Sequence, residues 1–185
     1  MSVLFITESY LKANTEVNDN VDPKLITPAI TEAQDIDLQD LLGSALYTDL
    51  KTKVASDADL SGFASYKTLM DGYIIPALKY YTLYRLLMPM TVKLMNKSVM
   101  TRTSDNANSI SIDDVYKLEE RYLNKAQWYG RRLVNYLCDN TTTYTLYNSY
   151  TSNNSTIHPN QSSFAGGMFL EKNNTDGFTE KFTKD

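Results

Sequence analysis

The sequence predicts an all-α protein, a small helical bundle around a long central helix with an extended C-terminal arm. Apolar residues recur at helical spacing through most of the first 139 residues. One stretch, residues 73–95, is apolar over about two thirds of a helical circumference, so other helices must surround it. After residue 140 the chain becomes rich in Asn, Ser and Thr, a composition that cannot bury a core of its own. We therefore divide the chain into a bundle, residues 1–139, and an arm, residues 140–185.

Short helices are predicted before the central one. Thr27 followed by Pro28 is typical of an N-cap and a first helical position. Gly43 is expected to end this helix as the glycine after its last turn, and Ser44 can begin the next helix. The apolar side of the first of these helices is predicted to consist of Ile26, Ile30, Ala33 and Ile36.

The central helix is predicted over Tyr73–Met95, after a shorter helix at Phe63–Tyr73. Pro76 suits a first helical turn, where its missing N–H costs nothing. Pro89 should bend the helix without ending it, because it lies in the polar stripe, where water can bond the freed carbonyl. A membrane span is the alternative for this stretch, but three cations interrupt it, namely Lys79, Arg85 and Lys93.

The last helix has the clearest start. A polar loop, residues 98–109, precedes it and has room for a short hairpin. Ser111 is predicted as N-cap and Asp114 as the third helical residue, as in a capping box. Acids lead and bases finish this helix, as the helix dipole favours. It should end near Asn140 and bury Val115, Leu118, Tyr122, Ala126, Tyr129, Leu133 and Tyr136.

Catalytic and metal-binding constellations are missing from the sequence. The single cysteine, Cys138, and the single histidine, His158, cannot together build a structural zinc site, and no internal disulfide is possible. His158 lies in the polar arm, and no base near Cys138 in sequence would activate its thiol. We therefore predict a protein that is not an enzyme and that needs no cofactor or metal. No signal peptide precedes the first helix, which predicts synthesis and use in a cytoplasm.

One surface feature is predicted on the last helix. Arg121, Lys125, Trp128 and Arg132 follow one another at intervals of three to four residues, roughly a quarter turn from the core face. Three interpretations remain open: an aromatic that covers the rim of the bundle under solvated bases, a protein contact surface, or a nucleic-acid site. Trp and Arg are enriched in protein interfaces. The net charge of −4 weakens the nucleic-acid interpretation.

The arm contains apolar residues that are spaced as anchor points. We expect these anchors to contact an adjacent subunit or a neighbouring ring, since the arm cannot offset its own ordering entropy. They are Tyr144, Tyr147, Phe164, Met168, Phe169 and Leu170.

The sequence also resembles a known family, the head–tail connector (adaptor, or head-completion) proteins of tailed bacteriophages. The likeness is greatest to the branch found in phages of Bacteroidetes, including the crAss-like phages. It covers nearly the whole chain in order, and its most specific part runs from Pro28 to Gly43. The stretches that carry it are LITPAITEAQDIDLQDLLGSALY, YKTLMDGYIIPALKYYTLYRLL, AQWYGRRLVNYLCDN and FAGGMFLE.

The resemblance implies a structural virion protein. Its expected partners are further copies of itself in a ring, commonly of twelve, the portal protein above, and the next tail or connector ring below. DNA would pass through the channel without sequence-specific binding, and no membrane would be involved. The expected location is the head–tail junction of the virion, after assembly in the host cytoplasm. The alternative function is a DNA-packaging or regulatory nucleic-acid-binding protein that uses Arg121, Lys125 and Arg132.

Overall fold

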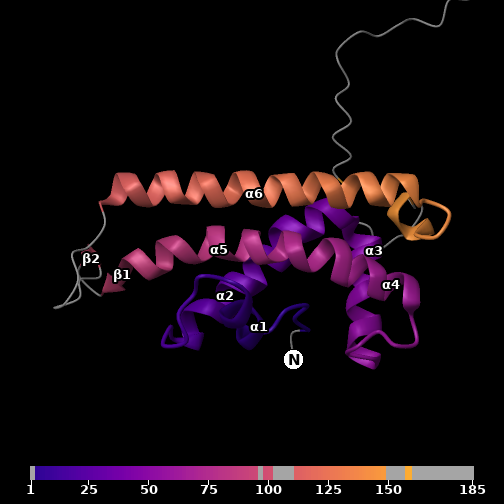
Figure 1. Cartoon of the computed structure of the whole chain (residues 1–185), viewed down its shortest axis with the longest axis horizontal. Coiled ribbons are helices and arrows are strands. Elements are labelled where there is room, and N and C mark those ends of the chain that lie inside the picture. The colour runs from indigo at the N-terminus through magenta and orange to yellow at the C-terminus, as the bar shows by residue number, and fades with distance from the viewer. Residues whose placement is uncertain (1–2, 96–97, 102–110, 149–156, 160–185) are drawn as a thin grey trace, which may run out of the picture.

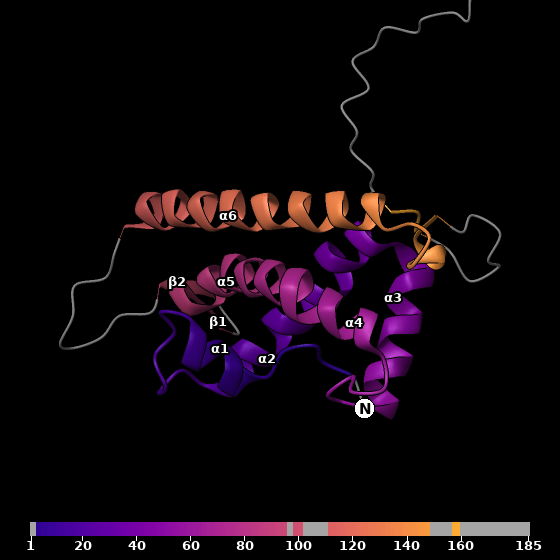
Figure 2. The same ribbon diagram turned by 45° about the vertical axis from the view of Figure 1, so that its right-hand side comes forward.

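The computed structural model describes residues 3–95, 98–101, 111–148 and 157–159. Its elements form layers, with α6 on one side of α5 and with α1 and α2 on the other (Figures 1 and 2). The predicted all-α class is confirmed, and one two-stranded hairpin accompanies the helices. In chain order the elements are α1 (Glu8–Asn14), α2 (Pro23–Glu32), the π-helical η1 (Ala33–Leu38), α3 (Gln39–Ser56), α4 (Ala64–Leu69), the π-helical η2 (Met70–Ile74), α5 (Ile75–Thr91), β1 (Val92–Met95), β2 (Ser98–Thr101), α6 (Ile112–Asp139) and the 3₁₀ turn η3 (Thr145–Asn148).

Two antiparallel helices, α5 and α6, form the long axis of the molecule (Figure 1). Two stacked tyrosine pairs show how the helices are aligned: Tyr80 stacks on Tyr129, and Tyr73 stacks on Tyr136. Tyr73 lies seven residues before Tyr80, and Tyr136 lies seven residues after Tyr129, as antiparallel helices require. Seven residues make about two helical turns, so both pairs lie on the same side of this helix pair. The pairing fixes how the two helices lie against each other along their lengths.

The predicted central helix is confirmed in position but is shorter than expected. It ends at Thr91, and β1 takes the place of its predicted last turn. β1 pairs antiparallel with β2, with Val92 opposite Thr101. Leu78 and Leu86 are buried, as expected for a helix that is apolar over about two thirds of its circumference. Thr82 is completely buried as well. Its hydroxyl donates to the Leu78 carbonyl at 2.8 Å, which satisfies the polar group inside the core.

Helix starts follow local capping. The Ser111 hydroxyl accepts the Asp114 N–H at 3.2 Å, as predicted for α6. The predicted start of the second helix is wrong. It begins at Pro23, and the side chain of Asp22 accepts the Lys24 N–H. Pro28 lies inside the helix with its side chain exposed, so solvent can reach the backbone group that it leaves unbonded.

The π-helical segment η1 contradicts the predicted position of one apolar side chain. Ile36 was predicted on the apolar side of its helix, but it is 55% exposed. A π turn holds more residues than an α turn, so a residue predicted inward at 100° per residue is carried around to the surface. In exchange, Gln34 turns inward and is 1% exposed. Its side chain accepts the Phe5 N–H and donates to the Val3 carbonyl, which attaches the N-terminal segment to the bundle.

Gly43 divides α3, as predicted, with a φ of +73° and a ψ of 155°. Residues 157–159 return to this corner. The Ser44 N–H donates to the Ile157 carbonyl at 2.9 Å, and the Ile157 N–H donates to the Ser44 hydroxyl at 3.1 Å. A Cβ atom on Gly43 would lie 2.7 Å from Cδ of Pro159. The corner therefore needs glycine both for its backbone conformation and for the close approach of the returning segment.

We expect Gly43→Ala to destabilise the fold by about 1–3 kcal/mol, because this region of φ and ψ is open essentially to glycine alone. Displacement of Pro159 adds to the cost. Gly72→Ala is the matched control, since a Cβ there meets nothing within 4 Å. Urea unfolding of both variants measures the difference. Equal midpoints for the two variants would contradict this account of the corner.

The bundle continues beyond the predicted boundary at residue 139. Tyr144 and Tyr147 are each 1% exposed and belong to the core of their own subunit. The Tyr144 hydroxyl donates to the Ser65 carbonyl at 2.8 Å, and its ring meets Tyr66 edge-on. The prediction that these two tyrosines contact another subunit is therefore wrong. Phe164, Met168, Phe169 and Leu170 lie outside the described residues, so their role stays a prediction.

Candidate interaction surface

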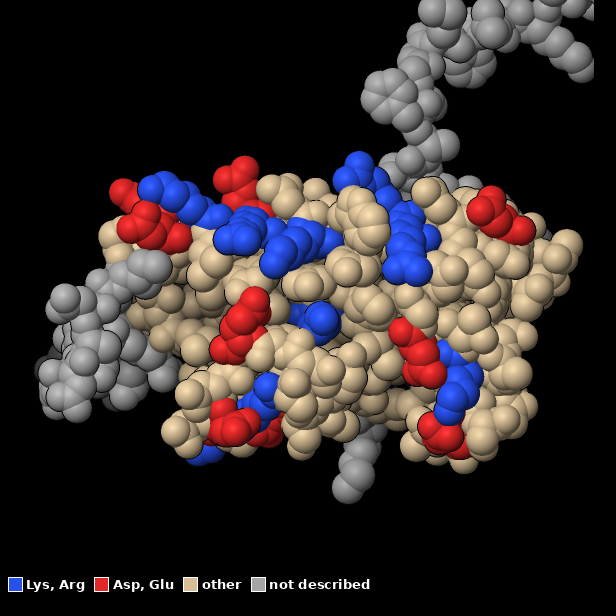
Figure 3. Space-filling model, viewed as in Figure 1, with Lys and Arg blue, Asp and Glu red and all other residues tan. Residues whose placement is uncertain are grey.

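The residues singled out on α6 lie along one side of the helix, beside the face that it turns to the core. We call the surface made by Arg121, Lys125, Trp128 and Arg132 the ridge. Trp128 is 54% exposed, Arg121 and Arg132 are exposed, and Lys125 is half-buried. Figure 3 displays a row of Lys and Arg side chains along α6 on the face that it presents. The prediction that Trp128 lies off the core is confirmed.

Tyrosine rings from η2, α5 and α6 support two cations of the ridge. The Lys125 ammonium lies 5.3 Å from the centre of the Tyr80 ring and 5.4 Å from that of Tyr122. The guanidinium of Arg132 lies 5.0 Å from the centre of Tyr73. All three distances are within the range of cation–π attraction. The rings therefore hold the two long cationic side chains over the α5–α6 seam, which reduces the rotamer freedom that a partner would otherwise have to remove.

Trp128 is also held in place. Its ring meets that of Tyr129 edge-on, with the centroids 4.9 Å apart, and Tyr129 in turn stacks on Tyr80. A shallow hollow beside the Trp128 ring is also lined by Arg121 and Lys125. An exposed indole fixed by a half-buried aromatic is the kind of rigid, amphipathic anchor that protein interfaces use.

Charge on the ridge is not neutralised by its own subunit. Within the described part of the chain, none of Arg121, Lys125 and Arg132 forms a salt bridge, whereas Lys117, one turn earlier, pairs with Asp114. Burial raises the pKa of Tyr80 and of Tyr122, and the carboxylate of Glu16 adds to both shifts. These phenols therefore stay neutral at physiological pH. The ridge is positive and presents aromatic rings among its cations.

Four tyrosines beneath the ridge were assigned to the core or left unassigned by the sequence reasoning. Tyr73 on η2 stacks on Tyr136 of α6, and Tyr80 on α5 stacks on Tyr129 of α6, so that these rings lie beneath the ridge. The sequence contained a signal for them. The two tyrosines before the loop are seven residues apart, and so are the two on α6, so that antiparallel packing can bring both stacked pairs into contact at once. The predicted anchors Phe164, Met168, Phe169 and Leu170 lie outside the described residues, so any contact they make stays a prediction.

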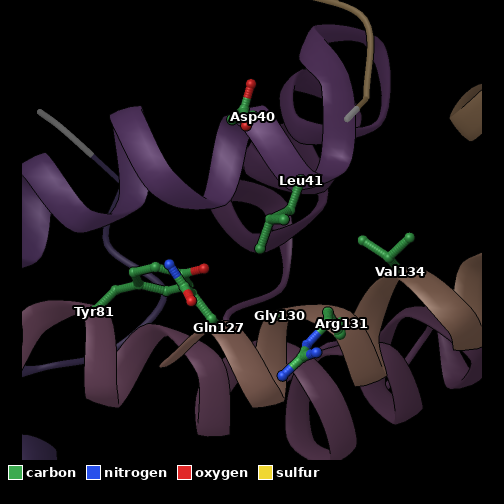
Figure 4. A pocket seen from close by; sticks show the side chains of 7 residues that line it. All are labelled: Asp40, Leu41, Tyr81, Gln127, Gly130, Arg131 and Val134. Carbon is green, nitrogen blue, oxygen red and sulfur yellow. The ribbon is translucent and has the colours of Figure 1, made fainter. Parts of the chain in front are cut away.

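The opposite side of α6 faces the start of α3 across a hollow (Figure 4). Asp40 and Leu41 line it from α3, and Tyr81 from α5. From α6, Gly130 allows a close approach, since a Cβ there would lie 3.0 Å from the Tyr81 hydroxyl.

In the residues that the structure describes, no cluster of three or more His, Cys, Asp or Glu side chains could hold a metal ion. No helix in that same part of the chain is long and apolar enough to cross a bilayer.

Comparison with known proteins adds a family. No curated protein and no solved structure matches the chain. A family model described as a family of unknown function, DUF6712, matches residues 38–157, more than half of the 185 residues. The matched range covers α3 to α6 and the buried Tyr144 and Tyr147, and it ends at Ile157, the residue that pairs with Ser44. The chain therefore belongs to the DUF6712 family, a family of unknown function.

Proposed function

We propose that this protein is a structural subunit of a connector ring between the portal and the tail of a phage virion, where the ring extends the DNA channel. The observation that carries the proposal is the ridge on α6. A rigid Trp with three cations that have no carboxylate partner among the described residues is an unused contact surface on an otherwise well-packed bundle. The resemblance of the sequence to head–tail connector proteins implies the assembly, a ring that commonly has twelve identical copies.

The negative net charge of the chain is consistent with a channel through which DNA passes. The chain has a net charge of −4, so a ring of such subunits would present a wall that does not hold DNA tightly. The cations would be directed at protein neighbours, where buried or half-buried pairs favour one partner over others. Among the described residues, the ridge brings together three cations that form no salt bridge, whereas Lys51, Lys53 and Lys67 pair with carboxylates of the chain.

The test is decoration of the portal. Purified protein is mixed with the portal protein encoded by the same genome, over a range of salt concentrations, and imaged by negative stain. We expect an additional ring of density on one end of the portal. Portals that stay bare at every salt concentration would overturn the proposed function.

Trp128→Ala should leave the subunit folded but reduce portal decoration. The side chain is 54% exposed, so its removal costs the bundle little, while an interface would lose its aromatic anchor. Tyr116→Ala is the matched control, because Tyr116 is 52% exposed on the same helix but outside the ridge. Circular dichroism checks folding, and the fraction of decorated portals is counted for each variant. Decoration that is equal in both would assign Trp128 to the rim of the bundle.

Nucleic-acid binding is the second candidate, favoured by the aromatic rings among the cations of the ridge. Duplex DNA binding by the isolated protein should then weaken steeply as salt rises. A mobility shift at near-physiological salt that is lost in Arg121→Ala and Arg132→Ala would favour this function. Such a result, combined with bare portals, would replace the connector by a DNA-binding protein.

A further inference from the structure

A second exposed apolar residue lies in a surface of opposite charge. Ile36, 55% exposed, projects from the π-helical η1 between two aspartates. π-Helical turns inside helices are frequent at functional sites. We call the surface that consists of Glu32, Asp35, Ile36, Asp37 and Asp40 the acidic face.

The acidic face keeps an excess of negative charge. Arg85 binds Asp37 through two hydrogen bonds of 2.6 and 2.9 Å and lies 3.8 Å from Glu32. Lys51 lies 3.3 Å from Asp35. The three carboxylates of Glu32, Asp35 and Asp37 outnumber these two cations, so this part of the face carries a formal charge of −1.

The two surfaces are complementary. Each presents one large apolar side chain, Trp128 on the ridge and Ile36 on the acidic face, and each apolar side chain is about half exposed. The ridge surrounds its Trp with cations, and the acidic face surrounds its Ile with carboxylates. Such a pairing would bury both apolar groups while it brings together charges of opposite sign.

The two surfaces also lie on different sides of the α5–α6 pair. On α6, Gln127 lines the hollow shared with Asp40 of the acidic face, and Trp128 is a further 100° around the helix (Figure 4). On α5, Tyr80 lies under the ridge, whereas Arg85, about 140° around the helix, holds the acidic face. One copy can therefore use both surfaces at the same time.

From these observations we infer that copies of this chain associate head to tail, with the ridge of one copy docked on the acidic face of the next. An interface between two different surfaces is heterologous, and repetition of it closes into a ring or extends into a filament. The inference deepens the proposed function, because it names the contact that would build the ring. Self-association itself can be tested without a portal.

The experiment mixes two variants that are each defective in one surface. Trp128→Ala/Arg132→Glu removes the ridge, and Ile36→Lys removes the acidic face. Each changes residues that the structure leaves at least partly exposed, so both should fold. In sedimentation velocity the wild-type chain should form oligomers larger than a dimer as its concentration rises. Each variant alone should be monomeric, with self-association at least about 30-fold weaker, as expected for the loss of an anchor. An equimolar mixture should form dimers and nothing larger, because one intact ridge meets one intact acidic face.

Two controls accompany the mixture. Met90→Lys makes the same kind of change at another exposed apolar residue, 37% exposed, and should associate as the wild type does. Circular dichroism of every variant excludes unfolding as the cause of a monomer. A wild-type chain that stays monomeric at its highest soluble concentration, or a mixture that yields no dimer, would overturn the inference.

The outcomes also separate this inference from the proposed function. Portal decoration by the wild type, together with a mixture that yields no dimer, would refute the head-to-tail contact and leave the connector ring standing. Dimers in the mixture, together with bare portals, would do the reverse. A ridge variant that loses DNA binding while it still self-associates would assign the ridge to nucleic acid and refute the head-to-tail contact.

Discussion

A chain that ends at Asp139 is expected to unfold, or to retain only a small part of the stability of the whole protein. It lacks Tyr144 and Tyr147, two of the most completely buried side chains among the described residues. Removal of a buried large aromatic costs about 3–5 kcal/mol. Two such losses approach the whole stability of a typical domain, about 5–15 kcal/mol. Urea unfolding, followed by circular dichroism, measures the effect.

A chain that ends at Pro159 is the control for this truncation. It keeps both tyrosines and the pairing of Ile157 with Ser44, so we expect it to unfold at nearly the same urea concentration as the full chain. If the chain that ends at Asp139 were equally stable, the tyrosines would contribute little. The division of the protein at residue 139, drawn from composition, would then be the right one.

Leu78→Asp is expected to abolish the folded state. Leu78 is completely buried on α5, where the helix contacts both α2 and α6. An aspartate there would either bury an unpaired charge or have to be protonated. We expect the free energy of unfolding to fall by more than about 4–5 kcal/mol, the range of the most damaging substitutions. Met90→Asp, on the same helix but 37% exposed, should remain folded. Far-ultraviolet circular dichroism and thermal melting distinguish the two variants, and a folded Leu78→Asp would mean that the buried side of α5 is wrongly assigned.

Local chemistry alone predicted several elements correctly. Ser111 caps α6 through a bond to the third residue of its own helix, and that geometry needs nothing from the rest of the chain. Gly43 marks the division of α3 because a positive φ is a property of one residue. Trp128 could be placed off the core because the periodicity of α6 is regular over 28 residues.

Other features depend on groups that are distant in the sequence. Arg85 meets Asp37 across 48 residues, and Ile157 pairs with Ser44 across 113. Tyr144 follows the end of α6 in a polar segment, and its burial depends on Ser65 and its neighbours, 79 residues earlier. Composition suggested an arm at this point, because it averages over a window of residues and does not reveal that two aromatic side chains within that window are buried in the core.

The sequence by itself therefore determined the helical class, the cap and core side of α6, the glycine corner and the outward position of Trp128. Each of these depends on interactions within one or two helical turns, or on hydrophobic periodicity. Only the tertiary structure decided that the π turn of η1 exposes Ile36 and that Tyr144 and Tyr147 complete the core. It alone also showed that tyrosines of η2 and α5 lie beneath the cations of α6. These outcomes depend on which helix faces which, because burial and cation–π contacts join groups whose separation along the chain carries no information about their distance in space.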